Sequence, residues 1–328
     1  MKNSIHIGRG LLPPFPEAVV IRDTHVAKLY PDIPWKEIVI PAGEGYKTRE
    51  TKAFIEDELT TRGYGRKVVL IAMGGGVVTD LTGFVAATFC RGVPLILFPT
   101  TPLAMVDAAI GGKNGVNTPL MKNAVGTIYR AESTWIDIDY ISSCSEKALK
   151  NGLAEMIKHG IIWDQSYLDF LEENIEPLLK KDLEKWLPAI SKSIEIKSEI
   201  VEQDPHENGL RVVLNFGHTT AHAIETLSNY TIPHGQAVLM GLIVALRLSD
   251  HPFQEKISAL CTALLDEIPL FDPKELFALM ARDKKALHGV PCFVLVSKAR
   301  HHTLEPITEA AFIQAYSCMD NTIRQRER

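Results

Sequence analysis

Short apolar runs separated by turn residues dominate the first 140 residues of the chain. Such runs are typical of strands that are buried on both faces, as parallel strands are. Between two of them, residues 48–62 place Phe54, Ile55 and Leu59 on one side and stop at Gly63, as an amphipathic helix does. Strands that alternate with helices predict right-handed βαβ units, with ligands at the carboxyl ends of the strands. The predicted strands cover residues 18–21, 37–40, 67–72 and 94–98.

After residue 140 the apolar positions recur at helical spacing, and one strand-like stretch, residues 292–296, interrupts this pattern near the end. We therefore predict an α/β domain over residues 1–140, with a mostly parallel, Rossmann-like sheet, and an all-helical domain over residues 141–328. The predicted helices of the second domain cover residues 147–161, 165–179, 183–203, 219–227 and 236–248.

Composition excludes several classes of protein. With 46% hydrophobic and 23% charged residues, the 328-residue chain is an ordinary globular protein. Its formal charge of -5 argues against nucleic acid as a partner. Five cysteines without a C-x-x-C pair favour a reducing compartment. Because there is also no apolar leader and no 18-residue apolar run, we expect a cytoplasmic protein that does not enter membranes.

A glycine-rich run, residues 73–80, follows a predicted strand and opens a predicted helix. Its three successive glycines would let main-chain N–H groups approach a phosphate at a helix N-terminus. The usual dinucleotide fingerprint fails here, because Thr79 stands where the third glycine belongs and no acidic residue follows about twenty positions later. A phosphate loop is the prediction, with a plain tight turn as the alternative.

A second glycine-rich turn, residues 107–117, is not a Walker A loop, since Asp107 stands at the first glycine position and Asn114 follows Lys113. Lys113, together with Lys122 and Asn123, could still bind an anionic group of a small substrate. The alternative is that these lysines are solvated surface residues.

Histidine placement is the strongest chemical signal. His218 and His222 are four residues apart, on one face of a predicted helix, and His234 opens the next helix. Glu155 lies in an otherwise apolar stretch, where an unpaired carboxylate would be costly. Two or three imidazoles with one carboxylate describe a catalytic zinc site or a related divalent site. In the alternative interpretation, Glu155 pairs with Lys158 on the helix surface and the histidines only pack.

A run of charges surrounds the histidine-rich segment and includes Lys192, Lys197 and Arg211. Such a run normally belongs to a solvated helix face. Lys197 and Arg211 would gain a role only if the fold directs them toward the metal.

As a set, the motifs resemble the 3-dehydroquinate synthase family, in order and with compatible spacing over residues 17–240. The resemblance implies an NAD-binding α/β domain, a helical metal-binding domain, an active site in the cleft between them, and a homodimer. The implied reaction converts 3-deoxy-D-arabino-heptulosonate 7-phosphate to 3-dehydroquinate and phosphate, a step of the shikimate pathway and of aromatic amino acid biosynthesis. The segments that carry the resemblance are residues 41–47, 74–80, 91–93, 99–101, 107–117, 122–123, 155–158, 215–222 and 234.

The resemblance also implies a role for each matching residue. Glu155, His218 and His234 would bind Zn²⁺ or Co²⁺, which leaves His222 unligated near the departing phosphate and revises the interpretation in which both helix histidines are ligands. Arg91 would reach the phosphate from a second subunit. NAD would be held by Asp23, Glu44, Lys47, Gly75, Gly76, Asp80, Thr100, Thr101, Lys113 and Lys122.

The substrate, a phosphorylated sugar acid, would be held by a further set. Lys197 and Arg211 would bind its carboxylate, and Asp107 and Lys158 its ring hydroxyls. Its phosphate would be bound, besides Arg91 and His222, by Lys113, Asn123, Asn215 and one of Lys284 or Lys285, with Lys285 preferred.

Three rival functions differ from this one in ways that can be tested. Sugar-phosphate cyclases that act on sedoheptulose 7-phosphate or glucose 6-phosphate have no substrate carboxylate, so Lys197 and Arg211 argue against them. Polyol and glycerol-phosphate dehydrogenases resemble the same two-domain plan but would yield net NADH. An inactive paralogue serving as a scaffold should have lost Glu155, His218 or His234, and the sequence retains all three.

Overall fold

The computed structural model describes residues 4–119, 121–205, 207, 209–266, 269–282 and 289–326, and of residues 320–326 the main chain alone. Two compact units divide the chain: Met1–Leu149 with Pro177–Ser198, and Lys150–Glu176 with Glu199–Arg328. The first unit thus includes residues 177–198, which a single division after residue 140 would assign to the second domain. The domain bounds 1–140 and 141–328 stay a prediction.

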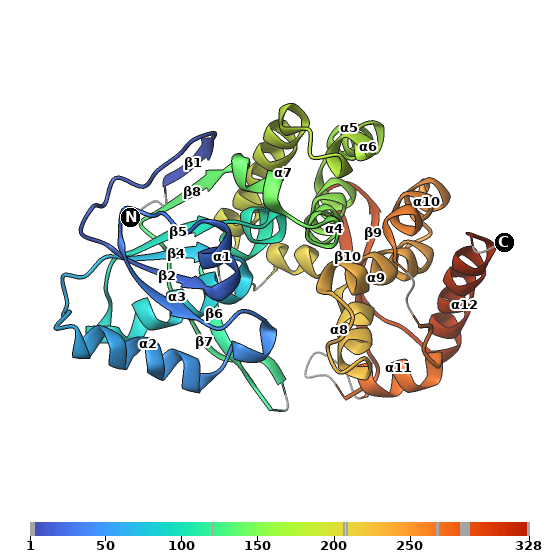
Figure 1. The fold of residues 1–328 in the computed structure, drawn as a ribbon. Coiled ribbons are helices and arrows are strands. Elements are labelled where there is room, and N and C mark those ends of the chain that lie inside the picture. Colours follow the sequence, from blue (N-terminus) through green and yellow to red (C-terminus); the bar gives the residue numbers. More distant parts are fainter. Residues whose placement is uncertain are drawn as a thin grey trace. The chain divides into compact units, whose positions relative to one another are not determined.

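A six-stranded parallel sheet forms the centre of the first unit (Figure 1), with the strand order β1-β8-β5-β4-β2-β3. The four predicted strands are confirmed as β2, β3, β4 and β5, whereas β1 and β8 were not predicted. The bounds are β1 (Ser4–Gly8), β2 (Val19–Asp23), β3 (Lys36–Ile40), β4 (Leu70–Gly74), β5 (Leu95–Pro99) and β8 (Ser133–Asp137).

Neighbouring residues of each strand point to opposite faces of this sheet and enter two separate cores. Ile21 and Leu97 belong to the core that also contains residues of helices α2 (Arg49–Thr61) and α3 (Gly76–Thr88). Val20 and Phe98 belong to the core on the other face, with Val26 of helix α1 (Thr24–Leu29). Both faces are therefore covered, which explains why the strands are continuous apolar runs in the sequence.

The strand order reverses between β2 and β4. Strand β3 follows β2 and pairs with its outer edge, whereas β4 returns to the other edge of β2, and β5 and β8 continue outward from there. Ligands of doubly wound sheets bind outside the carboxyl ends of the strands at such a reversal. In this chain those two strand ends carry Asp23 and Gly74.

An antiparallel hairpin, β6 (Lys113–Thr118) with β7 (Met121–Ile128), lies outside the main sheet and was not predicted. It packs closely on α3: a Cβ on Gly83 would lie 1.8 Å from Asn114 Oδ1. The Asn114 amide donates to the main-chain carbonyls of Gly112 and Tyr129, which holds the hairpin base closed. The glycine-rich turn of residues 107–117 thus leads into a strand.

Most of the second unit is helical, as predicted (Figure 1), and helices α4, α6 and α7 include residues of both units. The predicted helix over residues 165–179 is two helices, because Asn174 caps the first and its side chain donates to the Phe170 carbonyl. The bounds are α4 (Glu146–Trp163), α5 (Gln165–Glu173), α6 (Ile175–Leu179), α7 (Leu183–Gln203), α8 (His218–Leu227), α9 (His234–Leu248), α10 (Gln254–Leu264), α11 (Pro273–Met280) and α12 (Glu309–Arg326).

One strand-like stretch was expected to interrupt the helical second half, and the structure confirms it. The strand-like stretch 292–296 is part of β9 (Cys292–Lys298), which pairs antiparallel with β10 (His301–Pro306). The amide of Val296 donates to the Ser249 hydroxyl at 3.0 Å, just after the end of α9. A two-stranded ribbon is marginal alone, and here Phe293, Val294 and Val296 are buried.

Candidate functional site

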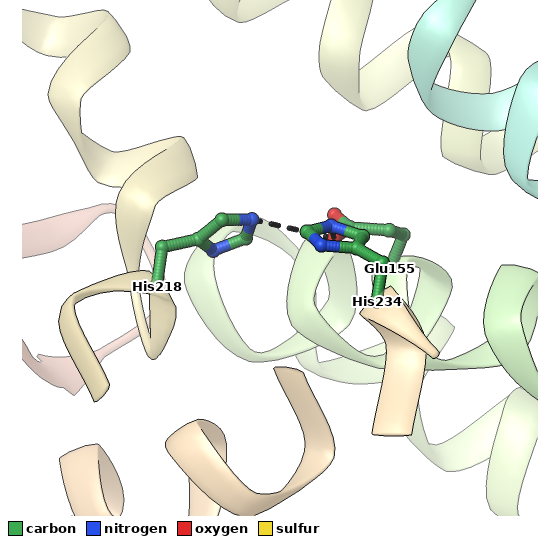
Figure 2. Close-up of side chains that lie close together, drawn as sticks. All are labelled: Glu155, His218 and His234. Atoms are coloured by element: carbon green, nitrogen blue, oxygen red, sulfur yellow. Dashed lines mark ion pairs between the residues drawn. The ribbon is translucent and has the colours of Figure 1, made fainter. Parts of the chain in front are cut away.

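Three side chains that are distant in the sequence converge in the second unit (Figure 2). Glu155 comes from the middle of α4, and His218 and His234 are the first residues of α8 and α9. One potential ligand atom from each lies within 4.8 Å of the others. The Nε2 atoms of His218 and His234 are 3.4 Å and 3.3 Å from Glu155 Oε1. Two imidazoles and one carboxylate are a donor set suited to a divalent transition metal.

Glu155 is fully buried and forms an ion pair with Lys158, which is 1% exposed. Burial raises the pKa of Glu155, but Lys158 and the two histidines hold it well below its usual value. Among the described residues, neither Glu155 oxygen has a partner in hydrogen-bond geometry. A buried carboxylate of this kind fits a bound cation. The pairing of Glu155 with Lys158 that the alternative interpretation expected does occur, but in the interior and not on the helix surface.

Close contacts between main chains fix the two histidine-bearing helix starts. Gly217 caps α8 in a left-handed conformation with φ of +78°, which glycine adopts without strain. At α9, the amide of Gly235 donates to the Asn151 side chain at 3.0 Å. A Cβ on Gly235 would lie 2.5 Å from Asn151 Cα, so α9 and α4 touch there without an intervening side chain. His234 and Glu155 are therefore held at a short separation.

Two residues near the cluster were missed by the sequence analysis. One is Asn151, one turn before Glu155 on α4, and the other is Glu225 of α8, whose carboxylate lies 3.4 Å from His234 Nδ1. Burial lowers the pKa of His234, but the hydrogen bonds and charges of Glu155 and Glu225 raise it to about 10. The available signal for Glu225 was weaker than that for Glu155, because Glu225 follows Ile224 but precedes the polar Thr226.

His222 is not part of the cluster. It is exposed, and its ring centre is 5.5 Å from that of His218, edge to face. The spacing of four residues left His222 open as a second helix ligand, whereas the geometry groups His218 with His234. Helical spacing alone cannot make this choice, because both histidines lie on one face of α8.

Arg211 and Asn215, two further predicted site residues, belong to the 3₁₀ helix η5 (Leu210–Asn215) that precedes α8. Arg211 is 3% exposed, and its guanidinium donates to the Pro205 carbonyl at 2.9 Å. The Asn215 amide donates to Glu207 Oε1 at 2.8 Å. A buried guanidinium is costly unless it is paired, so Arg211 is not a solvated surface charge.

The first unit contains a polar cluster around the buried side chain of Lys47. The Lys47 ammonium, on a side chain that is 4% exposed, lies 2.5 Å from both Asp80 Oδ2 and Asn123 Oδ1. Burial raises the pKa of Asp80 to about 6, although Lys47 lowers it. Close by in the same unit, Asn117 donates to Glu44 Oε1 at 2.8 Å. Four of these five residues were predicted to bind NAD or phosphate, and Asn117 was not.

The glycine run after β4 forms the strand–turn–helix that its sequence predicted. Gly75 is the N-cap of α3 and has no side chain that could accept from the first main-chain N–H groups of the helix. A Cβ on Gly75 would lie 3.4 Å from the Thr101 side chain, and the Thr100 amide donates to the Gly74 carbonyl. The loop has the shape of an anion site at a helix N-terminus. Phosphate binding itself stays a prediction.

Asp107 and Lys197 form an ion pair within the first unit. The Lys197 ammonium is 2.5 Å from Asp107 Oδ1 and 2.7 Å from the Asp107 main-chain carbonyl. Lys197 is 6% exposed, whereas Lys192 on the same helix is partly exposed and pairs with Glu195. The charge run of α7 therefore contains one buried cation as well as the solvated residues that such runs usually hold.

The other predicted site residues are dispersed. Asp23 caps α1 by accepting from the Val26 amide at 2.8 Å. Arg91 is exposed and, like Cys90 before it, has a positive φ. Lys113 is exposed and Lys122 is half-buried, both on the β6–β7 hairpin. Lys284 and Lys285 lie outside the described residues.

None of the helices in the described ranges combines the length and the apolar character that a membrane span requires.

Solved structures share this fold over nearly the whole chain. One is 2-epi-5-epi-valiolone synthase from Streptomyces hygroscopicus subsp. jinggangensis with NAD⁺ and Zn²⁺ bound, with a TM-score of 0.89 and 24% identity over 98% of both chains. Another is 2-deoxy-scyllo-inosose synthase complexed with carbaglucose-6-phosphate, NAD⁺ and Co²⁺, with a TM-score of 0.83 and 24% identity over 95% of both chains. A third is a probable glycerol dehydrogenase from Sinorhizobium meliloti, with a TM-score of 0.68 and 15% identity over 98% of both chains. The fold is thus one that sugar-phosphate cyclases share with a probable glycerol dehydrogenase.

Sequence comparison narrows this class. Residues 37–151 match the family model of the 3-dehydroquinate synthase N-terminal part, and residues 152–286 match that of the C-terminal part. The 3-dehydroquinate synthase of Geobacter sp. (strain M21) is 36% identical over 314 residues, which cover 89% of this chain and 86% of the relative. That of Nitrosomonas europaea is 38% identical over 326 residues, with 89% and 87% covered. The chain belongs to the 3-dehydroquinate synthase family.

Proposed function

We propose that the chain converts 3-deoxy-D-arabino-heptulosonate 7-phosphate to 3-dehydroquinate and phosphate. Family membership supports this reaction, and the convergence of Glu155, His218 and His234 carries the proposal. Two imidazoles that face one buried carboxylate form the donor set of a divalent metal site, which a chain without metal chemistry has no need to keep. A catalytically inactive scaffold is therefore disfavoured.

Glu155, His218 and His234 would hold a divalent cation, Zn²⁺ or Co²⁺, and the residues around Gly75 would hold NAD. When bound, NAD supplies a reversible hydride acceptor and the cation polarises the hydroxyl that is oxidised. The donor set fits the cation, because Glu155 Oε1 is buried, has no hydrogen-bond partner among the described residues, and lies 3.4 Å and 3.3 Å from the two imidazole Nε2 atoms.

The nucleotide assignment is supported by the first unit. Gly75 and Gly76 offer main-chain N–H groups to a pyrophosphate at the start of α3. On α3, Asp80 forms an ion pair with the buried Lys47. Thr100 and Thr101 would offer hydroxyls to the nucleotide. The remaining NAD contacts that we propose are Asp23, Glu44, Lys113 and Lys122.

The substrate assignment follows the charges of its groups. Lys197 and Arg211, both buried cations, would bind the carboxylate, and Arg can do so with two parallel hydrogen bonds. Asp107 and Lys158 would orient the ring hydroxyls. The phosphate would be received by Lys113, Asn123, Asn215, His222 and Lys285.

The decisive experiment incubates the purified protein with the heptulosonate phosphate and NAD, with and without a metal chelator. Phosphate and dehydroquinate are measured together with absorbance at the nicotinamide band. We expect equal amounts of both products, no net NADH, and no turnover after chelation. Glu155→Gln should be inactive, whereas Glu199→Gln, which alters a carboxylate paired with Trp163 and Arg300, should retain activity.

Other outcomes would identify other functions. Net NADH without phosphate release would indicate a dehydrogenase. Turnover of sedoheptulose 7-phosphate or glucose 6-phosphate in preference to the sugar acid would indicate another cyclase. Product formation that survives both chelation and Glu155→Gln would overturn the metal assignment.

We further propose a homodimer in which Arg91 serves the neighbouring subunit. Arg91 is exposed and held in a left-handed conformation with φ of +64°, as a residue aimed outward at a partner can be. Mixing Arg91→Ala with Glu155→Gln tests this, because a mixed dimer then has one complete site. We expect two inactive parents and recovery of about a quarter of the wild-type activity after exchange of subunits. No recovery in dimers that have demonstrably exchanged would contradict the shared site.

A further inference from the structure

Each imidazole of the cluster has one nitrogen turned toward Glu155 and the other turned toward a second acceptor. His218 Nδ1 lies 3.2 Å from the main-chain carbonyl of Phe216. His234 Nδ1 lies 3.4 Å from Glu225 Oε1. With Nδ1 engaged in this way, Nε2 is the nitrogen that both rings offer to a metal. Figure 2 shows the two rings approaching the Glu155 carboxylate from different elements.

The two rings differ in the acceptor that lies near Nδ1. His218 is backed by a neutral carbonyl, whereas His234 is backed by a carboxylate that is 3% exposed. A carboxylate that accepts from the outer nitrogen of a metal-binding histidine fixes its tautomer and its ring orientation, and makes the inner nitrogen a stronger ligand. The same carboxylate adds negative charge close to the site of a divalent cation.

We infer that Glu225 is a positioning residue of the metal centre: its carboxylate accepts from His234 Nδ1 and holds His234 Nε2 toward Glu155. This inference rests on the proposed function, because it takes the cluster as a metal site. It assigns a role to the buried acidic side chain of α8, and a buried carboxylate is costly unless it is paired.

The loop before α9 is held by the main chain of Glu225 and not by its carboxylate in the two hydrogen bonds that follow. That loop is held by the main-chain carbonyl of Glu225, which accepts from the Tyr230 amide at 2.8 Å and from the Ser228 hydroxyl at 2.9 Å. A change of the side chain leaves this carbonyl in place. Substitution of Glu225 therefore changes the contact with His234 but leaves these two hydrogen bonds to the main-chain carbonyl in place.

The test compares wild type with Glu225→Gln, Glu225→Leu and the control Glu199→Gln. Glu199 is a carboxylate of the same unit that also accepts from a ring N–H, that of Trp163 at 2.8 Å, and among the described residues it belongs to no group that could hold a metal ion. Zinc affinity is measured by competition with a chromophoric chelator, and the visible spectrum is recorded after loading with Co²⁺. Circular dichroism and thermal unfolding of the metal-free proteins show whether each variant folds.

We expect Glu225→Gln, which keeps an acceptor but removes the charge, to bind zinc about 10-fold to 100-fold more weakly than wild type. Glu225→Leu, which removes both, should bind more weakly still and change the Co²⁺ spectrum. Glu199→Gln should match wild type in both measurements.

Wild-type zinc affinity and an unchanged Co²⁺ spectrum in folded Glu225→Gln and Glu225→Leu would overturn the inference and leave the proposed function standing. The inference would also be wrong if Glu199→Gln weakened zinc binding as much as Glu225→Gln does, because the effect is then not specific to His234. Failure of the wild-type protein to bind zinc or cobalt would overturn both the inference and the proposed function. The two failures are thus distinguishable.

Discussion

Gly241 of α9 lies against the main chain of Gly217, the residue that caps α8, so closely that a Cβ on Gly241 would be 2.0 Å from the Gly217 carbonyl oxygen. The main-chain nitrogen of Leu242, the next residue of α9, is also close to this cap, since a Cβ on Gly217 would be 2.9 Å from it. This contact holds the helix that begins at His218 against the helix that begins at His234. It therefore sets the separation of the two histidines.

Gly241→Ala should weaken both folding and metal binding. The added methyl group has no space, and forced insertion into a packed interior costs about 1 to 3 kcal/mol. We expect a lower urea midpoint and a weaker zinc affinity. Gly65→Ala is the control, because its Cβ would meet nothing within 4 Å and its φ is ordinary. A control that loses as much stability as Gly241→Ala would contradict the close approach.

Breaking the buried pair of Glu155 and Lys158 should destabilise the metal-free protein. Glu155→Ala leaves an ammonium that is 1% exposed without its partner, and loss of one member of a buried pair costs about 3 to 5 kcal/mol. Glu155→Ala combined with Lys158→Met should recover much of this loss. The measurement is chemical unfolding in the presence of a chelator. Equal stability of the single and double variants would show that Lys158 is not held by Glu155.

Lys197→Gln should impair use of the sugar acid. If the Lys197 ammonium binds the substrate carboxylate, its loss removes a charged hydrogen bond worth about 1.5 to 3 kcal/mol, or roughly a 10-fold to 100-fold fall in kcat/KM. Lys192→Gln on the same helix is the matched control, because Lys192 is partly exposed and pairs with its exposed helix neighbour Glu195. Steady-state kinetics on both variants provide the measurement, and equal kcat/KM values would remove Lys197 from the site.

Asp80 should make stability depend on pH between about 4 and 6. Its pKa is raised from 3.8 to about 6 by burial, so the folded chain keeps a proton that the unfolded chain releases. The free energy of unfolding therefore falls as pH rises through this range, by roughly 2 to 3 kcal/mol from this group. Asp80→Asn should lack that fall.

The measurement is urea unfolding of wild type, Asp80→Asn and Glu195→Gln at several pH values. Glu195 is an exposed carboxylate of α7 and should leave the wild-type slope unchanged. If Asp80→Asn shows the same pH dependence as wild type, the Asp80 carboxyl is ionised in the folded protein well below pH 6.

Sequence reasoning was most reliable where structure is local. The strands β2 to β5 and the helix α7 could be predicted because their apolar spacing matches their own period. The missed strands β1 and β8 have only two apolar residues each, so neither forms the longer apolar run that marks β2 to β5, and the β6–β7 hairpin has few buried side chains. The break at Asn174 was missed because the apolar spacing continues across it, although Pro177 requires the first turn of a new helix.

The residues of the candidate site also separate into those that the sequence indicated and those that it did not. The residue types and the order of Glu155, His218 and His234 pointed to a metal, and the family resemblance selected these three over His222. Glu225 and Asn151 were missed because each acts through a partner more than eight residues away, on another helix. Their importance depends on contacts that no spacing within one helix encodes.

By itself, the sequence determined the class of fold, the family and the chemical groups available for catalysis, because these depend on periodicity and on motifs of neighbouring residues. The tertiary structure alone decided which groups meet: that Glu155 faces two imidazoles, that Lys158 is buried with it, and that Glu225 stands behind His234. The physical reason is that such meetings depend on how closely helices approach. Here that approach is set by main-chain contacts at Gly217, Gly235 and Gly241 between segments far apart in the chain.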